Sequence, residues 1–418
     1  MTNDNVNFRE SMGGDSGDSA RDGANAQRFF DDLGRRQAAR DAQDRSTLID
    51  CLNEGLRLAH EHHLGLGWLV DAAYAYVGDH VWEGTLCPRV PGVKVDSAVP
   101  ITTAGQALAI ALVAVVERQH RHRGGTEAVL RRCLDVALLD GEARDLVAYF
   151  HAETTRDLGR VTESEGELRE LVVRGARLAD TARKGLIHLQ RRAGRFRDIN
   201  ADLTGVVPAP VWSRLAGDLW WTQACFERAD ECYVAARDQA WSCGAVGEAA
   251  LSEACRGFAA GFGEPGTAER VIESARDLLS AVDITWAGLQ VALGELLTTA
   301  GADGDFHAKC DEIAVRARSA GLSSSAAYAE LARGFHCSVR RDRAGIAVAR
   351  DALRQHARSG QFGYLLEIVR FCSTGDGGED GEEDLAVASD WIDGVEITAA
   401  RWRDTVERRR TYLNRDHA

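Results

Sequence analysis

Helix-breaking residues recur at a nearly constant spacing through most of this sequence. In each case a glycine or aspartate follows an apolar, helix-favouring segment, at Gly141, Gly175, Gly244, Asp283, Gly321 and Gly360. The last three steps are 39, 38 and 39 residues, the first is 34, and the step of 69 fits two units of about 35. Glycine suits these positions because the residue after a helix often adopts a left-handed conformation. A period of this length, with two helices per unit, predicts an all-α solenoid of stacked antiparallel helix pairs.

Small residues repeat within the units as well. Alanines stand at matching places in successive second helices, at Ala236, Ala275, Ala314 and Ala352. A small side chain there lets the two helices of a pair approach closely. Leu158-Gly159 and Ala193-Gly194, which are 35 residues apart, predict tight turns between paired helices. The low count of six prolines, with alanine and leucine throughout, also favours helices.

One unit carries a family likeness. The segment RLAGDLWWTQACFERADECYVAARDQAWSCG resembles a tetratricopeptide repeat (TPR), with Ala229, Tyr233 and Ala236 at the second-helix positions of the family pattern. Trp221 and Gln223 stand near the Leu-Gly position of the first helix. The resemblance implies a right-handed superhelical solenoid and a role in binding other proteins.

A longer stretch, residues 126–412, resembles the C-terminal repeat arm of large actinobacterial signal-transduction ATPases of the STAND class. Those ATPases carry a phosphate-binding loop, and the pattern Gly-x-x-x-x-Gly-Lys-Ser/Thr is absent from this sequence. The resemblance therefore implies a repeat arm without the ATPase domain.

Composition changes along the chain predict its domains. Near the N-terminus the sequence is polar and aperiodic, three of the six prolines fall in one irregular insertion, and STGDGGEDGEED leaves nothing to bury. The predicted parts are a disordered tail (1–25), an N-terminal helical cap (26–100) with a Pro-rich insertion (78–102), TPR-like repeats (101–372), an acidic flexible linker (373–384) and a C-terminal helix (385–418).

Charge and composition exclude several classes of function. The net charge of −14 argues against a general nucleic-acid binder, which needs a basic surface. The longest apolar run, residues 107–116, is shorter than the about 20 residues that span a bilayer. The N-terminus lacks a basic region followed by an apolar core, and the ten cysteines are scattered without a Cys-x-x-Cys pair. We therefore expect a cytoplasmic protein with reduced thiols and no membrane segment.

The sequence offers few candidates for chemistry. The densest histidine cluster, residues 60–63, is not His-Glu-x-x-His and fits a solvated helix end better than a zinc site. Residues 261–266 are glycine-rich but lie between two helices rather than after a strand, so we interpret them as a turn. We predict no catalytic residue, metal or cofactor. A helical enzyme with a site near the insertion at 78–102 is the least favoured alternative.

The favoured function is a scaffold or regulatory adaptor that binds a partner protein or peptide. In a two-helix solenoid the first helices line a concave groove, where cations and aromatic rings supply contacts. Candidate contact residues on first helices are Arg156, Lys184, His188, Arg191, Trp221, Arg256, Tyr328 and Arg333. Trp221 also suits the core between paired helices. The second interpretation is a regulatory sensor that changes its curvature when a peptide or small ligand binds.

Overall fold

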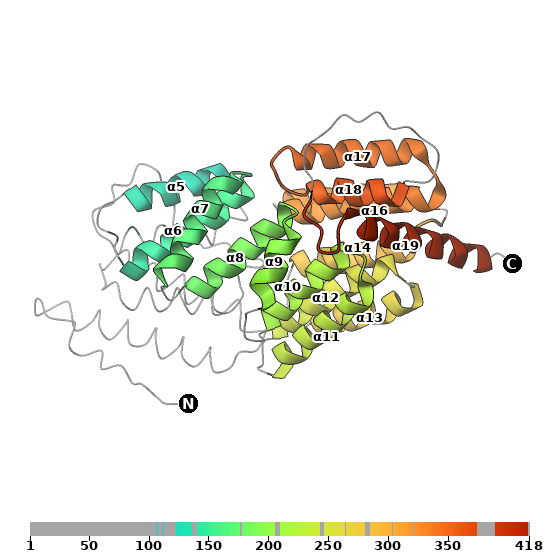
Figure 1. Ribbon diagram of the computed structural model, residues 1–418, viewed down its shortest axis with the longest axis horizontal. Coiled ribbons are helices and arrows are strands. Elements are labelled where there is room, and N and C mark those ends of the chain that lie inside the picture. Colours follow the sequence, from blue (N-terminus) through green and yellow to red (C-terminus); the bar gives the residue numbers. More distant parts are fainter. Residues whose placement is uncertain are drawn as a thin grey trace, which may run out of the picture. The chain divides into compact units, whose positions relative to one another are not determined.

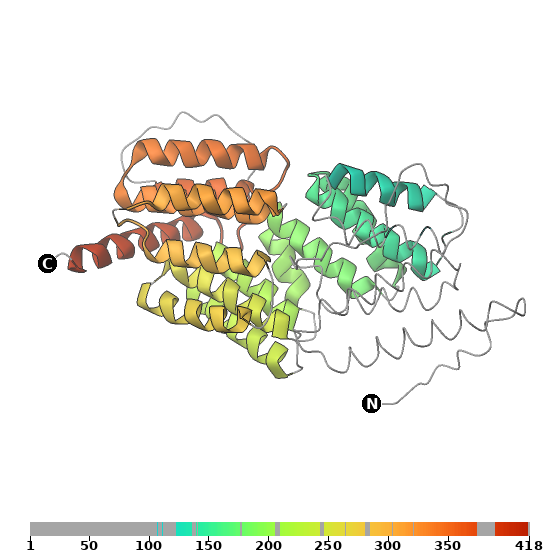
Figure 2. The ribbon, with the colours of Figure 1, turned by 180° about the vertical axis from the view of Figure 1, so that it is seen from behind.

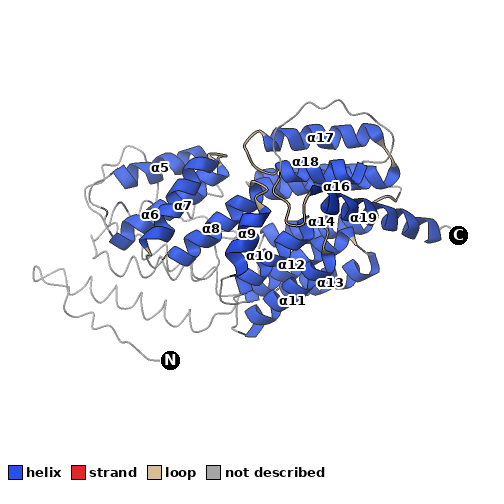
Figure 3. Cartoon of the chain, viewed as in Figure 1, coloured by secondary structure: helices blue, strands red, loops and turns tan. Residues whose placement is uncertain are grey.

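Every element that the structure describes is an α-helix, as Figure 3 shows, so the all-α prediction is confirmed for this part of the chain. The computed structural model describes residues 107, 111, 123–135, 139, 141–175, 178–204, 210–242, 246–263, 265–280, 285–302, 304–320, 322–373 and 389–416. The predicted tail (1–25), the histidines of 60–63, the insertion at 78–102 and all but the first residue of the linker (373–384) lie outside the described residues.

The helices follow one another with short connections. Their bounds are α5 (Arg123–Asp135), α6 (Gly141–Asp157), α7 (Val161–Arg174), α8 (Ala179–Arg192), α9 (Phe196–Thr204), α10 (Pro210–Thr222), α11 (Phe226–Ser242), α12 (Val246–Phe262), α13 (Pro265–Leu279), α14 (Thr285–Thr298), α15 (Phe306–Ser319), α16 (Ser323–Arg340), α17 (Arg343–Ala357), α18 (Gly363–Ser373) and α19 (Val395–Asp416). Among these helices none has both the length and the apolarity that crossing a membrane requires.

Of the predicted turn residues that the structure describes, Gly175 and Gly360 follow helices and Gly141 begins α6, whereas Gly244, Asp283 and Gly321 lie outside the described residues. Gly159 separates α6 from α7 and Gly194 separates α8 from α9, with φ of 84° and 75°. Gly175 closes α7 with φ of 64°, and Gly360 follows α17 with φ of 73°. All four backbones are in the left-handed region, where a side chain would strain the turn. The glycine-rich residues 261–266 span the end of α12 and the start of α13, so they lie between two helices as predicted.

The described residues fall into two compact units that divide within α6. The first unit ends at His151 and the second begins at Ala152. In the first unit the side chains of Leu130, Leu146 and Phe150 are buried, and the His151 ring lies 3.2 Å from the Glu127 carboxylate. The division lies inside the predicted repeat array.

The second unit is a ladder of helices. Each odd-numbered helix from α11 to α17 packs between the even-numbered helices that precede and follow it. The even-numbered helices α8 to α18 also pack against one another in order. Figures 1 and 2 show α16, α17 and α18 as a stack, seen from two sides. Helix α16 is surrounded so fully that residues 324–339 are all buried.

The alanine register is correct for three of four units. Ala236, Ala275 and Ala314 are at most 1% exposed, as expected where paired helices meet. Ala352 is only partly buried, and the apolar face of α17 instead presents Ala349. The prediction was therefore wrong for Ala352, which lies beside the buried stripe formed by Ile346, Ala349 and Leu353.

An aromatic cluster joins distant parts of the sequence in the core of the second unit. The ring of Trp221 lies edge-on to Phe258 at 5.2 Å and to Tyr328 at 5.7 Å between centroids. Phe262 meets Trp402 of α19 in the same edge-on geometry at 5.3 Å. Rings in this geometry gain free energy beyond the burial of their area. The cluster therefore ties α19 to the ladder.

Helix α19 runs along the turns where even-numbered helices end. Trp402 Nε1 donates to Thr222 O at the end of α10, over 3.0 Å. Arg409 donates to carbonyls at the ends of α12 and α14, and Arg410 donates to Ser338 O and Val339 O near the end of α16. These carbonyls are the groups that a helix C-terminus leaves without partners. The predicted C-terminal helix thus covers the edge of the ladder at which the even-numbered helices end.

Candidate functional site

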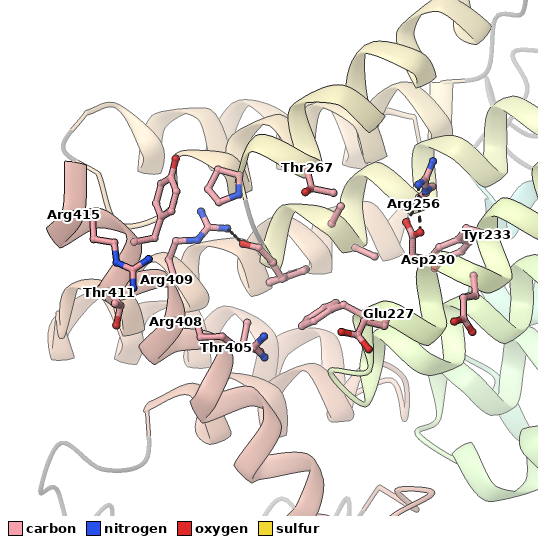
Figure 4. Close-up of a pocket in the computed structure, with 18 residues that line it drawn as sticks. Glu227, Asp230, Tyr233, Arg256, Thr267, Thr405, Arg408, Arg409, Thr411 and Arg415 are labelled. Carbon is pink, nitrogen blue, oxygen red and sulfur yellow. Dashed lines mark hydrogen bonds and ion pairs between the residues drawn. The ribbon is translucent and has the colours of Figure 1, made fainter.

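A groove of about 840 Å³ lies between α19 and the ends of α11, α12 and α13. We call it the edge groove, and its lining residues come from 226–233, 256–267 and 405–415. Its volume lies within the roughly 300–1,000 Å³ that is usual for ligand sites. Figure 4 shows side chains from α11 and α19 on its opposite sides. All of them belong to the second unit.

The wall formed by α11 is acidic. It presents Glu227, Asp230 and Glu231, of which Glu227 and Glu231 are exposed and make no ion pair within the described part of the chain. Asp230 accepts from Arg256 Nε over 2.6 Å. Burial lowers the pKa of Arg256, but its hydrogen bond to Asp230 and the charge of Glu253 outweigh burial and raise that pKa. Two acidic groups on this wall therefore remain available to a basic ligand group.

The wall formed by α19 is basic. Arg415 makes no ion pair or hydrogen bond within the residues that the structure describes, and Arg408 pairs with Asp404 over 2.8 Å in an exposed i,i+4 contact. Exposed pairs of this kind contribute little and yield readily to a competing partner. Arg409 is 2% exposed, and burial lowers its pKa to about 10. No carboxylate within the described residues pairs with it, so this wall keeps a positive field.

The floor of the edge groove is apolar, and one end of it is a helix terminus. Phe226, Ala259 and Phe262 line the floor, while Pro265 and Thr267 belong to the first turn of α13. Proline suits the first helical position because its missing N–H would be unpaired there in any case. The N-terminus of a helix favours negative charge. It lies on the same groove as the arginines of α19.

The edge groove combines an apolar floor with charges of opposite sign on its two walls. An apolar floor between an acidic and a basic wall matches a segment with an apolar face, a basic edge and an acidic edge. The opposite charges also determine which edge of such a segment faces which wall.

Three of the predicted contact residues gather in the buried interior instead. Arg191 is 6% exposed and forms an ion pair with Asp218, which also accepts from Tyr233 Oη over 2.7 Å. Burial lowers the pKa of Arg191, but the charge of Asp218 outweighs burial and raises it. Trp221 and Tyr328, at 1% and 2% exposure, belong to the aromatic cluster. An open concave groove lined by these three side chains does not fit their burial.

The interior also explains why these residues are polar. Tyr328 Oη lies 3.4 Å from Tyr364 Oη, and the charges of Arg191 and Asp218 act on both phenols. Burial raises the pKa of Tyr328, so the phenol stays a neutral hydrogen-bonding group. A buried charge is tolerated only when it is paired and hydrogen-bonded. The network supplies that pairing.

The other predicted contact residues are dispersed. Arg156 pairs with Glu153 over 2.6 Å, Arg333 is held by Glu330 and Asp311, and Arg256 lies on the edge groove. Lys184 and His188 are partly buried on α8. Of the eight predicted residues, only Arg256 lines the edge groove.

The groove residues of α19 were missed because nothing local distinguishes them. Arg408, Arg409 and Arg415 follow a polar, basic pattern that is typical of a solvated helix face. Three charges within one short segment were the available signal. Their grouping against α11 depends on contacts across more than 140 residues, as the bond from Arg409 to Gly263 illustrates.

Comparison with known proteins returns no relative: no protein-family model matches the sequence, and no curated protein matches it.

Proposed function

We propose that this protein is a binding module, a TPR-like solenoid that holds a peptide segment of a partner protein in the edge groove. The ladder of alternating helices supports a solenoid of helix pairs, because each unit contacts mainly its neighbours. The observation that carries the binding proposal is the groove itself, with its apolar floor and oppositely charged walls.

Burial favours the edge groove over the concave surface as the binding site. The first-helix side chains Arg191, Trp221 and Tyr328 already satisfy one another and their neighbours inside the ladder. Exposing them to a peptide would break a buried ion pair, which is strongly destabilising. Glu227 and Arg415, in contrast, are exposed on the two walls of the groove.

The ligand is a short segment that carries acidic and basic groups on opposite edges. The acidic edge faces Arg415 and Arg408 of α19, and the basic edge faces Glu231 and Glu227 of α11. Apolar side chains of the ligand cover Phe226 on the floor. Apolar contacts supply most of the binding free energy, and the charges determine orientation and discrimination.

Selection from a displayed peptide library tests the proposal. Peptides enriched on the wild-type protein are measured by fluorescence anisotropy against Arg415→Glu, Glu231→Arg and the control Arg318→Glu. Arg318 is an exposed arginine on α15 that does not line the groove. Reversal of one exposed groove charge is expected to weaken binding by roughly 2- to 30-fold, or about 0.5–2 kcal/mol. Arg318→Glu should bind like the wild type.

A charge swap on the peptide completes the test. A peptide whose acidic residue is replaced by arginine should regain affinity for Arg415→Glu but not for Glu231→Arg. Absence of enriched peptides, or enriched peptides that bind both groove variants as tightly as the wild type, refutes the edge groove as the site.

A further inference from the structure

Three side chains with metal-binding atoms converge at the turn between α16 and α17. His307 lies in the first turn of α15, Cys337 in the last turn of α16, and Asp342 caps the N-terminus of α17. One ligand atom from each residue lies within 4.8 Å of the other two. The cluster is separate from the edge groove, and it brings together a thiol, an imidazole and a carboxylate.

The backbone of the turn creates this convergence. Arg341 ends α16 in the left-handed conformation, with φ of 59°, and the chain folds back so that Asp342 N donates to Cys337 O over 2.8 Å. Asp342 Oδ1 then accepts from Gly345 N over 3.1 Å, as an N-cap does. The second carboxylate oxygen does not take part in the cap.

Gly345 shows how closely the thiol and this second oxygen approach each other. A Cβ atom at residue 345 would overlap both Cys337 Sγ and Asp342 Oδ2. The Cys337 thiol and this carboxylate oxygen therefore both occupy the space beside the glycine. A ring nitrogen of His307, from α15, lies within 4.8 Å of the thiol and of the carboxylate.

We propose that His307, Cys337 and Asp342 bind a divalent transition-metal ion of the zinc class, with a fourth position open to water. Zinc takes thiolate, imidazole and carboxylate ligands in tetrahedral geometry, at about 2.0–2.3 Å. Ligand atoms around such an ion are about 3.3–3.6 Å apart, so shifts of roughly 1 Å from the observed positions close the site. Calcium and magnesium prefer oxygen ligands alone, which this set does not supply.

The neighbouring arginine has carboxylate partners of its own. Arg333 Nη1 lies 3.4 Å from His307 Nδ1, and Arg333 also pairs with Glu330 at 3.0 Å and Asp311 at 2.5 Å. Metal binding therefore requires Arg333 to give up its contact with His307, and the two carboxylates compensate its charge when it does. Binding of the metal converts the thiol to a thiolate, and the released proton passes to solvent or buffer. The bound thiolate and Asp342 then neutralise the dication.

The site links three helices at the edge that α19 covers. A bound ion joins α15, α16 and α17 within one turn of Ser338 and Val339, whose carbonyls accept from Arg410 of α19. Its role is a structural brace of this turn. Binding is expected to raise the melting temperature, because the ion binds the folded chain and not the dispersed ligands of the unfolded chain.

Cobalt(II) and zinc titrations of the full-length, chelator-treated protein test the inference. We expect one tightly bound cobalt per chain with a thiolate-to-metal charge-transfer band in the near ultraviolet, displaced by one equivalent of zinc. Cys337→Ser should abolish the band. The control Cys372→Ser, at a buried thiol of α18, should leave it unchanged.

Asp342→Asn separates metal binding from folding. Asparagine caps a helix as well as aspartate does, so α17 is retained while the anionic ligand is lost. The affinity of Asp342→Asn for the metal should fall by more than the roughly 10- to 100-fold that loss of an outer-shell partner causes. Its circular dichroism spectrum should be the same as that of the wild type. A protein that binds no cobalt or zinc at micromolar concentrations, or a band that persists in folded Cys337→Ser, overturns the site.

Discussion

Replacement of Arg409 by methionine tests how α19 is held on the ladder. The Arg409 guanidinium is buried and donates to four backbone carbonyls at the ends of α12 and α14, with distances of 2.6–3.0 Å. The accepting carbonyls are those of Gly261, Gly263, Leu297 and Thr298. The guanidinium carbon also lies over the ring of Phe335, 5.9 Å from its centroid.

The size of the destabilisation follows from two opposing contributions, the hydrogen bonds that Arg409 makes and the hydration that it loses on burial. Each hydrogen bond from a charged donor contributes about 1.5–3 kcal/mol, so four of them amount to roughly 6–12 kcal/mol. The charge also lost its hydration on burial, as its lowered pKa indicates, and that penalty is several kcal/mol. Methionine removes the penalty but leaves the carbonyls unpaired beneath an apolar side chain. We expect Arg409→Met to destabilise the fold by about 3–5 kcal/mol.

Urea unfolding, followed by circular dichroism and tryptophan emission, measures the global free energy. Hydrogen exchange of α19 measures local release of the helix, because Trp402 and its neighbours protect that segment. Arg409→Lys keeps the charge but not the planar fork, so an intermediate loss is expected. Arg403→Met, at an exposed site on the same helix, should change the free energy by less than about 0.5 kcal/mol.

Two results would refute this reasoning. A free energy of unfolding for Arg409→Met within about 1 kcal/mol of wild type, together with unchanged exchange in α19, would mean that the carbonyls do not need the guanidinium. Equal losses in Arg403→Met and Arg409→Met would assign the effect to the net charge of α19.

Three further changes probe the core of the second unit. Gly217→Ala places a methyl group 2.6 Å from the ring of buried Tyr233 and should destabilise the fold by about 1–3 kcal/mol. The control Gly288→Ala, with open space around it, should be neutral or stabilising. Equal melting temperatures of the two variants would contradict this packing. Tyr233→Phe removes a 2.7 Å hydrogen bond to buried Asp218 and should destabilise by about 1–3 kcal/mol, and a neutral result in urea unfolding would contradict the network. Burial, and then the charge of Arg318, lower the pKa of His356 below 6.5, so the folded state prefers the neutral ring and loses stability as pH falls through 6.5. Wild type should therefore lose more stability than His356→Gln between about pH 7 and pH 5, and parallel pH profiles would exclude this role.

The helices and their turns were predictable from local sequence. Gly159, Gly194 and Gly175 mark chain reversals because their backbone conformation is local chemistry that glycine alone adopts without strain. Other turns carry no such mark, because Ala224, Arg341 and Phe362 adopt left-handed conformations without being glycine. The partial exposure of Ala352 comes from how α17 packs rather than from the turn before it, since Ala236 is buried although the turn at Ala224 also lacks glycine.

The candidate sites could not be predicted in the same way. Burial of Arg191 depends on Asp218, which lies 27 residues away on another helix, and no local pattern pairs these two residues. The metal-binding cluster joins His307 to Cys337 and Asp342 with spacings that match no zinc motif. The buried ion pair and the metal-binding cluster both arise from the packing of neighbouring units. The repeat period predicts that the units stack, but it does not predict which side chains meet.

The carbonyls at the ends of the even-numbered helices account for the donors of α19. Trp402 donates to the end of α10, Arg409 to the ends of both α12 and α14, and Arg410 to the end of α16. Each of these helix ends leaves carbonyls of negative partial charge, so a helix that crosses them needs side chains that donate hydrogen bonds. Arginine suits this role because its planar guanidinium carries five N–H donors. The arginines of α19 bond to these carbonyls on one face of the helix and supply the basic wall of the edge groove on the other. Binding in the groove therefore depends on the docking of α19.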